Sequence, residues 1–399
     1  MAHSETFKVP AGFRFAATTA GIKASGNPDL ALIEAPALAS AAAVFTKNLV
    51  VAAPVMLGRK HLAASKGQVR AVLVNAGNAN CATGKQGRAA AERSCKELAK
   101  ALGCKANVIV PSSTGVIGVP FPAVKLVSGL PALLEARGDS SEFAMAFSRA
   151  IMTTDTRPKV ALADFAVKGK TVRLLGVAKG AGMIHPNMAT MLAYVVTDVE
   201  ASPKQLNKLL KAVADRTFNR ISIDGDTSTN DTLCLLASGK SGVAFSKAEK
   251  QFAAALEQVC ASLAEQIVTD GEGVKHVVRL RIAGAKSEAE AVRIAKTIAH
   301  SPLVKTAWAG SDPNWGRILA AAGRSGVQFD PGKVDIYFGS IQVCKKGGAA
   351  GFDEKKAHEY LSQPAFDITV QLRRAKAAIT FLTCDLTSDY VHINADYTT

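Results

Sequence analysis

Residues 179–196 read KGAGMIHPNMATMLAYVV, a loop that runs into an apolar segment. Glycines at 180 and 182 and the turn residues Pro186 and Asn187 indicate an irregular connection. The apolar residues after them predict a buried strand that begins at about Thr190. The pattern therefore places the hydroxyl of Thr190 where a loop meets a strand.

Two interpretations of this loop come from its residues alone. A phosphate-binding loop would continue into Gly-Lys-Ser/Thr and the N-terminus of a helix, and neither follows here. A threonine that favours this position because β-branched residues suit strands also fits the spacing. The spacing alone does not distinguish a chemical role for Thr190 from a structural one.

The segments on the N-terminal side predict alternating strands and helices. Residues 71–75 (AVLVN) predict a short buried strand, a turn-rich segment follows at 77–84, and a helix is expected from about 87 to 102. A strand at 108–110 leads into PSSTGVIG at 111–118, which predicts a loop with exposed backbone N–H groups.

The alternation continues on the C-terminal side. Helix starts are predicted where a capping serine precedes Pro203, and where two further serines form capping boxes with a glutamate three residues later. The expected starts are at 202, 246 and 287, and the expected strands are at 277–282, 333–338 and 377–382. The class is therefore α/β or α+β, and the lack of a Pro/Gly/Ser-rich linker predicts lobes that share a core.

Composition excludes several classes of protein. The chain has 399 residues, a length typical of two or three domains. Since 48% of the residues are hydrophobic, a large core can form. No biased tract suggests a disordered or fibrous protein. The longest mostly apolar stretch, 30–45, is interrupted by Glu34 and Pro36 and is too short to cross a bilayer of about 30 Å. The first ten residues lack the apolar run of a secretory signal, so a cytoplasmic location is expected.

Cysteine and histidine spacing gives no metal or disulfide framework. The 7 cysteines and 7 histidines are scattered, without a CxxC, HxH or HxxxH pair. Residues 224–231 (DGDTSTND) begin like a calcium loop, but the twelfth position is Leu235 where a glutamate would be required. No metal and no cofactor are predicted.

The net charge is unevenly distributed along the chain. Residues 1–189 carry 23 Lys+Arg and 10 Asp+Glu (+13), whereas residues 190–399 carry 25 and 23 (+2). The basic residues of the first part are spread singly, with little aromatic interleaving, which is more typical of solvated helix faces than of a nucleic-acid site.

Several long motifs resemble one known family. They are VNAGNANCATG at 74–84, PSSTGVIG at 111–118, MTTDTRPK at 152–159, KGAGMIHPNMATML at 179–192, FNRISIDGDTSTND at 218–231, GSDPNWGR at 310–317 and DLTSDYVHINADYTT at 385–399. Together they resemble the ornithine acetyltransferase family, the glutamate N-acetyltransferases of arginine biosynthesis, along nearly the whole chain. The resemblance implies an acetyltransferase without a cofactor.

The resemblance also implies a fold and an assembly. The fold is a layered α/β/β/α sandwich of the N-terminal-nucleophile type, with a C-terminal α/β lobe whose tail returns to the active site. The expected domains are 1–240 and 241–399. The chain cuts itself between Ala189 and Thr190 into fragments 1–189 and 190–399, which stay associated, and the family precedent is a heterotetramer with two copies of each.

An N-terminal threonine suits nucleophilic catalysis. Its hydroxyl needs an adjacent base, and its own α-amine, with a reference pKa of about 7.7–8.0, can serve as one. In the family, the threonine that corresponds to Thr190 takes the acetyl group from N-acetylornithine and passes it to glutamate. By resemblance, the hydroxyl of Thr114 and the backbone N–H of Gly115 stabilise the oxyanion, for which two donors are commonly needed.

The resemblance implies six residues that contact the substrates: Thr153, Lys179, Thr190, Glu272, Asn394 and Thr399. Lys179 suits a carboxylate and Glu272 suits an ammonium group. The choice between Thr153 and its neighbour Thr154 stays open. The apolar and aromatic residues of 390–397 are expected to hold the C-terminal tail in place.

Two alternatives remain beside the acetyltransferase. An amidase or aminopeptidase could use the same nucleophile with water in place of glutamate, and a nucleic-acid-binding protein could use the +13 segment. Acetyl-CoA as a further acetyl donor, which separates bifunctional from monofunctional members of the family, is not decided by the sequence. Apart from self-association, the expected partners are small molecules, with neither nucleic acid nor membrane.

Overall fold

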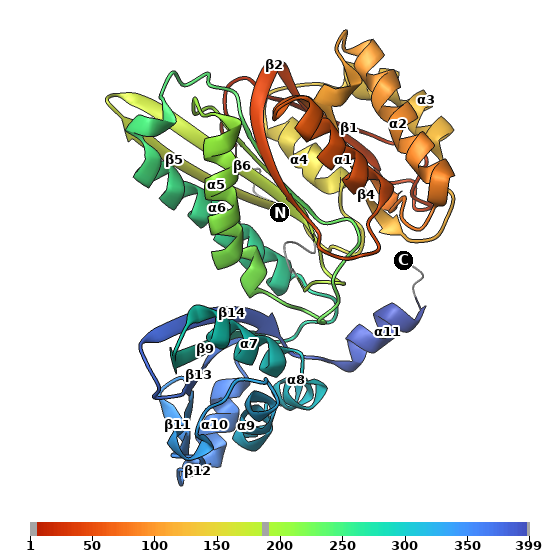
Figure 1. Ribbon diagram of the computed structural model, residues 1–399. Coiled ribbons are helices and arrows are strands. Elements are labelled where there is room, and N and C mark those ends of the chain that lie inside the picture. The colour runs from red at the N-terminus through yellow and green to blue at the C-terminus, as the bar shows by residue number, and fades with distance from the viewer. Residues whose placement is uncertain (1–5, 186–190, 397–399) are drawn as a thin grey trace.

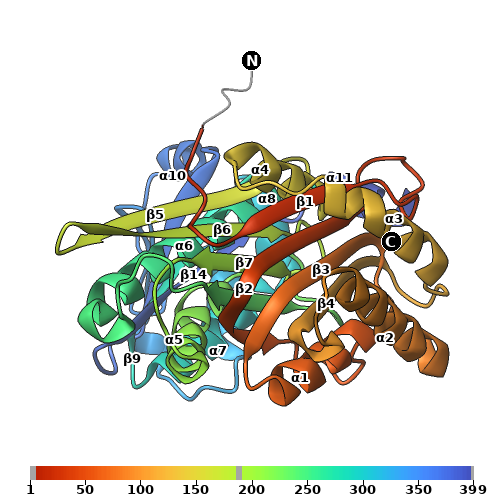
Figure 2. The same cartoon turned by 90° about the horizontal axis from the view of Figure 1, so that it is seen from above.

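The computed structural model describes residues 6–185 and 191–396, which form a large lobe and a smaller C-terminal lobe (Figure 1). The large lobe is built on one sheet, in which the strands follow the order β4-β3-β2-β8-β7-β6-β5 and β1 pairs with β2. The strands are β1 (Arg14–Thr18), β2 (Leu30–Phe45), β3 (Gln68–Asn78), β4 (Ile109–Val116), β5 (Lys159–Val167), β6 (Lys170–Lys179), β7 (Leu192–Thr197) and β8 (Thr232–Ala237). Figure 2 shows β5, β6, β7, β2, β3 and β4 following one another across the molecule.

Strand β2 is 16 residues long and belongs to two halves of this sheet. Its residues 30–34 pair with β1 and β3, whereas its residues 40–45 pair with β8. The pairing with β3 is interrupted between Glu34 and Ala39, and Pro36, which has no N–H to donate, lies in this gap. The sheet therefore turns at β2 into two half-sheets.

The half-sheets pack face to face. Phe15 of β1 and Val72 of β3 belong to the same apolar core as Leu175 of β6. The Nζ of Lys179, at the end of β6, lies 3.3 Å from the Oγ1 of Thr114 in β4, although four strands separate β4 from β6 in the sheet order. The chain thus brings the ends of distant strands to one place.

Helices cover both outer faces. The β1–β4 half packs against α1, α2 and α3, and the half with β5–β8 packs against α5 and α6, each through its own apolar core. The helices of this lobe are α1 (Ala53–Ala64), α2 (Gly84–Ala101), α3 (Ala123–Glu135), α4 (Ser141–Ala150), α5 (Pro203–Arg216) and α6 (Glu249–Thr269). The expected α/β/β/α sandwich is confirmed.

Helix starts follow the capping chemistry at two of the three predicted positions. Ser202 and Gln205 form a complete capping box at the start of α5, and the side chain of Ser287 accepts from the N–H of Glu290. The prediction at Ser246 is wrong, because this residue lies in a 3₁₀ turn (Phe245–Lys247) and α6 begins three residues later without a side-chain cap.

The segment 111–116 also differs from its prediction as a loop. It continues β4 as a strand in parallel register with β3, with an irregularity at Gly77 and Asn78. Pairing with β3 gives partners to backbone groups that the turn-like composition suggested would be exposed.

The C-terminal lobe has its own sheet, in the order β12-β11-β10-β13-β9-β14, packed on one apolar core with α7 to α10. Its elements are β9 (Val277–Ala285), α7 (Glu288–Ala299), α8 (Pro302–Ala309), α9 (Trp315–Gly323), β10 (Asp335–Phe338), β11 (Ile341–Lys345), β12 (Gly348–Ala349), α10 (Glu354–Leu361), β13 (Ala365–Gln371), β14 (Ala377–Cys384) and a last helix, α11 (Ser388–Asp396). The strands expected at 277–282, 333–338 and 377–382 are confirmed as β9, β10 and β14.

Helix α6 bears on the position of the boundary between the two lobes. It packs against β5 and β6 of the sandwich, although the predicted boundary at 240/241 would assign it to the C-terminal lobe. We propose that the boundary lies in the connection between α6 and β9, residues 270–276. Within the described residues, no helix is both long and apolar enough to span a bilayer.

Candidate active site

A cavity of about 1000 Å³ opens where the half-sheets meet the segments that follow α6 and begin α11. Six of the residues implied by the resemblance line it: Thr114, Gly115, Thr153, Lys179, Glu272 and Asn394. Met191 and Thr154 line it as well. Ala189, Thr190 and Thr399 lie outside the described residues.

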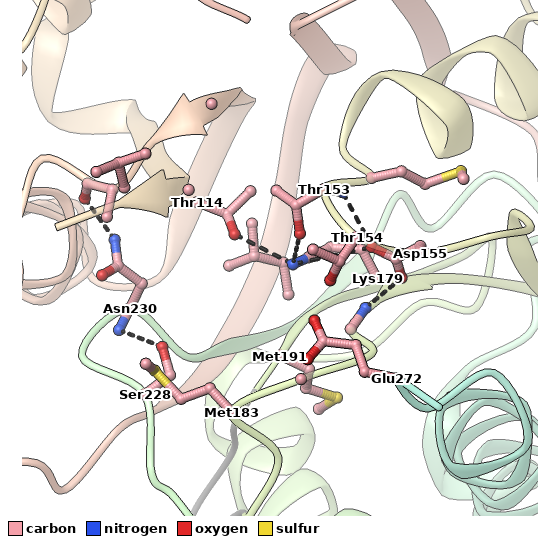
Figure 3. Close-up of a pocket in the computed structure, with 18 of the residues that line it drawn as sticks. Thr114, Thr153, Thr154, Asp155, Lys179, Met183, Met191, Ser228, Asn230 and Glu272 are labelled. Carbon is pink, nitrogen blue, oxygen red and sulfur yellow. Dashed lines mark hydrogen bonds and ion pairs between the residues drawn. The ribbon is translucent and has the colours of Figure 1, made fainter. Parts of the chain in front are cut away.

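Lys179 makes several of the polar contacts in this cavity. Its ammonium group lies between two threonines, 2.6 Å from the Oγ1 of Thr153 and 3.3 Å from that of Thr114 (Figure 3). Burial lowers the pKa of Lys179 below its usual value, although the carboxylate of Asp155, 3.9 Å away, opposes the shift. Of the neighbouring residues Thr153 and Thr154, between which the sequence left the choice open, Thr153 contacts this lysine.

A buried ion cluster of Asp155, Lys159 and Asp270 lies next to Lys179. The Nζ of Lys159 lies 2.6 Å from Asp155 and 2.5 Å from Asp270. Asp155 also accepts a 2.6 Å hydrogen bond from the N–H of Gly180. Burial by itself would raise the pKa of Asp155, but the ammonium groups of Lys179 and Lys159 hold it below its usual value. The cluster therefore fixes a negative charge beneath Lys179 and keeps that lysine in place.

The end of β4 at Thr114 and Gly115 is shaped by close backbone packing. Gly115 has φ +124°, and a Cβ on it would lie 2.3 Å from the carbonyl carbon of Gly77. The side-chain amide of Asn230 donates to the carbonyls of Ser113 (2.9 Å) and Ala79 (2.6 Å), which ties the end of β4 to its neighbours. Because the Thr114 hydroxyl accepts from Lys179, its own proton can be directed into the cavity.

Glu272 places a carboxylate on another wall. Its Oε2 accepts a 2.9 Å hydrogen bond from the Nδ2 of Asn394 in α11. Among the described residues, no lysine, arginine or histidine lies within 4.0 Å of this carboxylate. A Cβ on Gly182 would lie 2.3 Å from the Oε2 of Glu272, so the glycine loop leaves room for a carboxylate, and no phosphate is needed to explain it.

The tail is held differently from the expectation. Tyr390 lines the cavity, whereas Val391 and Ile393 are 58% and 37% exposed and do not anchor α11. Tyr397 lies outside the described residues. The link between this helix and the segment after α6 includes the hydrogen bond from Asn394 to Glu272 and one from the Oγ1 of Thr387 to the carbonyl of Gly273 (2.6 Å).

The acidic segment 224–231 positions the chain that leads toward Thr190. The carboxylate of Asp224 accepts from the N–H groups of Met183 (2.6 Å) and Ile184 (2.9 Å), and Thr227 donates to the carbonyl of His185 (2.9 Å). Within the described part of the chain, no group of three or more His, Cys, Asp or Glu residues is placed to hold a metal ion.

Sequence reasoning missed several residues of the site. Asp155 and Lys159 stand in the quoted motif MTTDTRPK, yet an i,i+4 pair of opposite charge is more often found at a surface. Asp231 also lines the cavity, and burial raises its pKa well above the usual value. Lys23 lines it from the loop between β1 and β2. Charge and spacing alone do not reveal that such groups are buried.

Comparison with known proteins gives consistent matches. The model of the ArgJ family matches residues 14–399. The arginine biosynthesis bifunctional protein ArgJ of Thermus thermophilus is 46% identical over 392 residues, with 98% of this chain and 99% of that protein covered. The protein of the same name from Methylococcus capsulatus is 45% identical over 395 residues, with 98% and 96% covered. The crystal structure of arginine biosynthesis bifunctional protein argJ from Bacillus halodurans matches with 40% identity and a TM-score of 0.51, over 52% of this chain and 100% of that one.

Proposed function

Because the chain belongs to the ArgJ family of arginine-biosynthesis enzymes, we propose that it transfers an acetyl group from N-acetylornithine to glutamate by a ping-pong reaction. The observation that carries the proposal is the convergence of Thr114, Gly115, Lys179 and Glu272 on one cavity that Met191 also lines. Thr190 directly precedes Met191 in the sequence.

We propose that the chain first cuts itself between Ala189 and Thr190. Hydrolysis of this peptide bond leaves a carboxylate on Ala189 and an α-amine on Thr190. The fragments would stay together, because β6 of the first is hydrogen-bonded to β7 of the second along Leu174–Lys179 and Leu192–Thr197. Association of two such pairs into a heterotetramer is part of the proposal and is measured by the mass of the processed protein in solution.

In the first half-reaction, the Oγ of Thr190 attacks the acetyl carbonyl of N-acetylornithine and its proton passes to the Thr190 α-amine. The hydroxyl of Thr114 and the N–H of Gly115 donate to the oxyanion that forms. The intermediate then collapses, the C–N bond breaks, and the proton moves to the departing nitrogen. Ornithine leaves and an acetyl ester remains on Thr190.

In the second half-reaction, the amine of glutamate attacks this ester. The C–O bond to Thr190 breaks, the hydroxyl recovers a proton from the attacking nitrogen, and N-acetylglutamate leaves. The sum is N-acetylornithine plus glutamate giving ornithine plus N-acetylglutamate, with no water consumed. This balance requires no redox partner or cofactor.

The charges of the cavity fit the ends of N-acetylornithine. Lys179 can bind its carboxylate as a point charge, oriented by Thr153. The carboxylate of Glu272 can accept its terminal ammonium group, with Asn394 fixing the carboxylate and Thr399 as a further contact of the proposal.

Acetyl transfer measured with purified protein tests this function. Formation of acetylglutamate from N-acetylornithine and glutamate, with ornithine in equal amount, is the expected result, and the same assay with acetyl-CoA tests the second donor. Thr190→Ala should leave one band on denaturing electrophoresis where the wild type gives two, and Thr190→Ser should retain cleavage. Acetate release without acetylglutamate would show that the enzyme is an amidase instead.

A further inference from the structure

Lys23 stands in the cavity wall without an assigned role, on a loop that is firmly held. The buried carboxylate of Asp29 accepts from the N–H groups of Ala20 (2.6 Å) and Lys23 (2.9 Å). The Nζ of Lys23 donates to the carbonyls of Pro28 (2.8 Å) and Ala150 (3.0 Å). Two of its three protons are therefore used, and the third can be offered to a ligand.

The aliphatic part of Lys23 lies beside Gly77, which pairs with Gly115 at the end of β4. A Cβ on Gly77 would lie 3.1 Å from the Cγ of Lys23, and Gly77 is the residue whose carbonyl carbon excludes a side chain from Gly115. The glycine at 77 thus allows Lys23 to lie against the same backbone that packs on Gly115. This contact places the lysine close to the proposed reacting centre.

Lys23 adds a second positive charge to a cavity of mixed sign. Burial, together with the nearby ammonium group of Lys179, lowers its pKa to about 8, although the carboxylates of Asp29 and Asp155 oppose the shift. Among the described residues, no carboxylate lies within 4.0 Å of its ammonium group, whereas Lys159 is neutralised by two. Lys23 is therefore a cation that lacks a close counter-ion.

The proposed substrates differ at their side-chain ends. Both carry an α-carboxylate, which Lys179 can bind. N-acetylornithine ends in an ammonium group and glutamate ends in a second carboxylate, which the charge of Glu272 would repel. Accommodation of both substrates requires a second cation for the acceptor. Arg149 also lines the cavity but is exposed to solvent, which weakens an ion pair.

We propose that Lys23 binds the side-chain carboxylate of glutamate and so selects the acceptor in the second half-reaction. This inference rests on the proposed acetyl transfer and adds a specificity residue to it. N-acetylornithine does not need this contact, so Lys23 should matter only after the acetyl group is on the enzyme.

Separate measurement of the half-reactions tests the proposal. In Lys23→Gln, the KM for glutamate should rise about 10- to 100-fold, the range expected for one hydrogen bond to a charged group. Glutamine, which lacks the second carboxylate, should be used equally by the variant and the wild type. The burst of ornithine released without acceptor should be unchanged, and Lys23→Arg should restore most of the preference for glutamate.

Lys125→Gln is the matched control, because Lys125 donates to the carbonyl of Gly21 in the same loop (2.7 Å) and does not line the cavity. An equal rise in KM for glutamate and glutamine, or a reduced ornithine burst, would assign Lys23 a structural role and overturn the proposal. A wild-type enzyme that uses glutamine as well as glutamate would overturn it without any variant. Absence of ornithine release from the wild type would instead refute the acetyl transfer itself.

Discussion

Replacement of Lys159 by methionine should destabilise the protein in a manner that depends on pH. The ammonium group lies 2.6 Å from Asp155 and 2.5 Å from Asp270, and the three side chains are 0–3% exposed. Methionine has a similar length and no charge, so the change leaves two buried carboxylates without their shared cation. Loss of one partner from a buried pair costs about 3–5 kcal/mol.

The contacts that the two carboxylates keep place the expected loss in the free energy of unfolding near the lower end of this range, at about 3 kcal/mol. Asp155 keeps hydrogen bonds from the N–H groups of Thr153 (3.0 Å) and Gly180 (2.6 Å), together with Lys179 at 3.9 Å. Asp270 keeps a hydrogen bond from the N–H of Thr156 (3.1 Å). These donors compensate part of the lost charge.

The pH dependence follows from the Asp155 carboxyl, whose pKa the lysines hold below its usual value. A lowered pKa contributes stability above the unfolded value of about 3.9, and this stability is lost as the pH falls through the folded value. Removal of Lys159 raises the folded pKa. The difference from wild type should therefore be complete at pH 7 and should shrink below about pH 5.

Denaturant unfolding in the Thr190→Ala background measures the effect on one intact chain. The control is Arg216→Met, which breaks a surface ion pair with Glu257 whose side chains are 40% and 41% exposed and which should cost about 0–1 kcal/mol. A loss for Lys159→Met no larger than this control, or a loss that is constant between pH 7 and pH 4, would refute the reasoning.

Three further predictions concern the proposed site. Gly115→Ala should lower kcat about 100-fold or more, since the new Cβ would meet the carbonyl carbon of Gly77 at 2.3 Å, and a wild-type kcat would contradict the oxyanion role. Glu272→Gln keeps an oxygen for Asn394 but removes the charge, so steady-state kinetics should show KM rising about tenfold for N-acetylornithine and not for glutamate, and equal rises would argue against an ammonium site. The preference for glutamate over glutamine should be constant below pH 7 and fall above pH 8, where Lys23, with a pKa of about 8, loses its proton, whereas a preference constant to pH 9 would exclude Lys23 as its source.

The layered fold and its contacts were only partly accessible from the sequence. The sequence spacing of Phe252, Leu256 and Leu263 is that of one helix face, and all three are buried in α6, because this periodicity reflects a local rule. The predicted start of α6 at Ser246 was wrong, since a serine with a glutamate three residues later permits a capping box but does not ensure that one forms. Strand 111–116 was missed because its hydroxyls and glycine favour turns locally, whereas pairing with β3 is a tertiary effect.

The candidate site shows the same limit. Motif resemblance supplied Thr114, Lys179, Glu272 and Asn394, and the structure brings these four together. Asp155 was not predicted as the support of Lys179, because Asp270, which shares Lys159 with it, is 111 residues away from that lysine and the burial of charge is set by the packed chain. Composition showed only that residues 1–189 carry an excess of positive charge. The structure shows that one of these basic residues, Lys159, neutralises two buried carboxylates.

Strand β2 has a mechanical consequence for turnover. Since β2 is one continuous strand that is hydrogen-bonded into both half-sheets, the half-sheets are joined along it and cannot move apart on that side. We therefore expect the frame around the cavity to keep its width while one amino acid leaves and another arrives. Exchange would then take place at the rim beside α11, and a rigid frame with a changing rim suits a reaction whose steps share one set of groups.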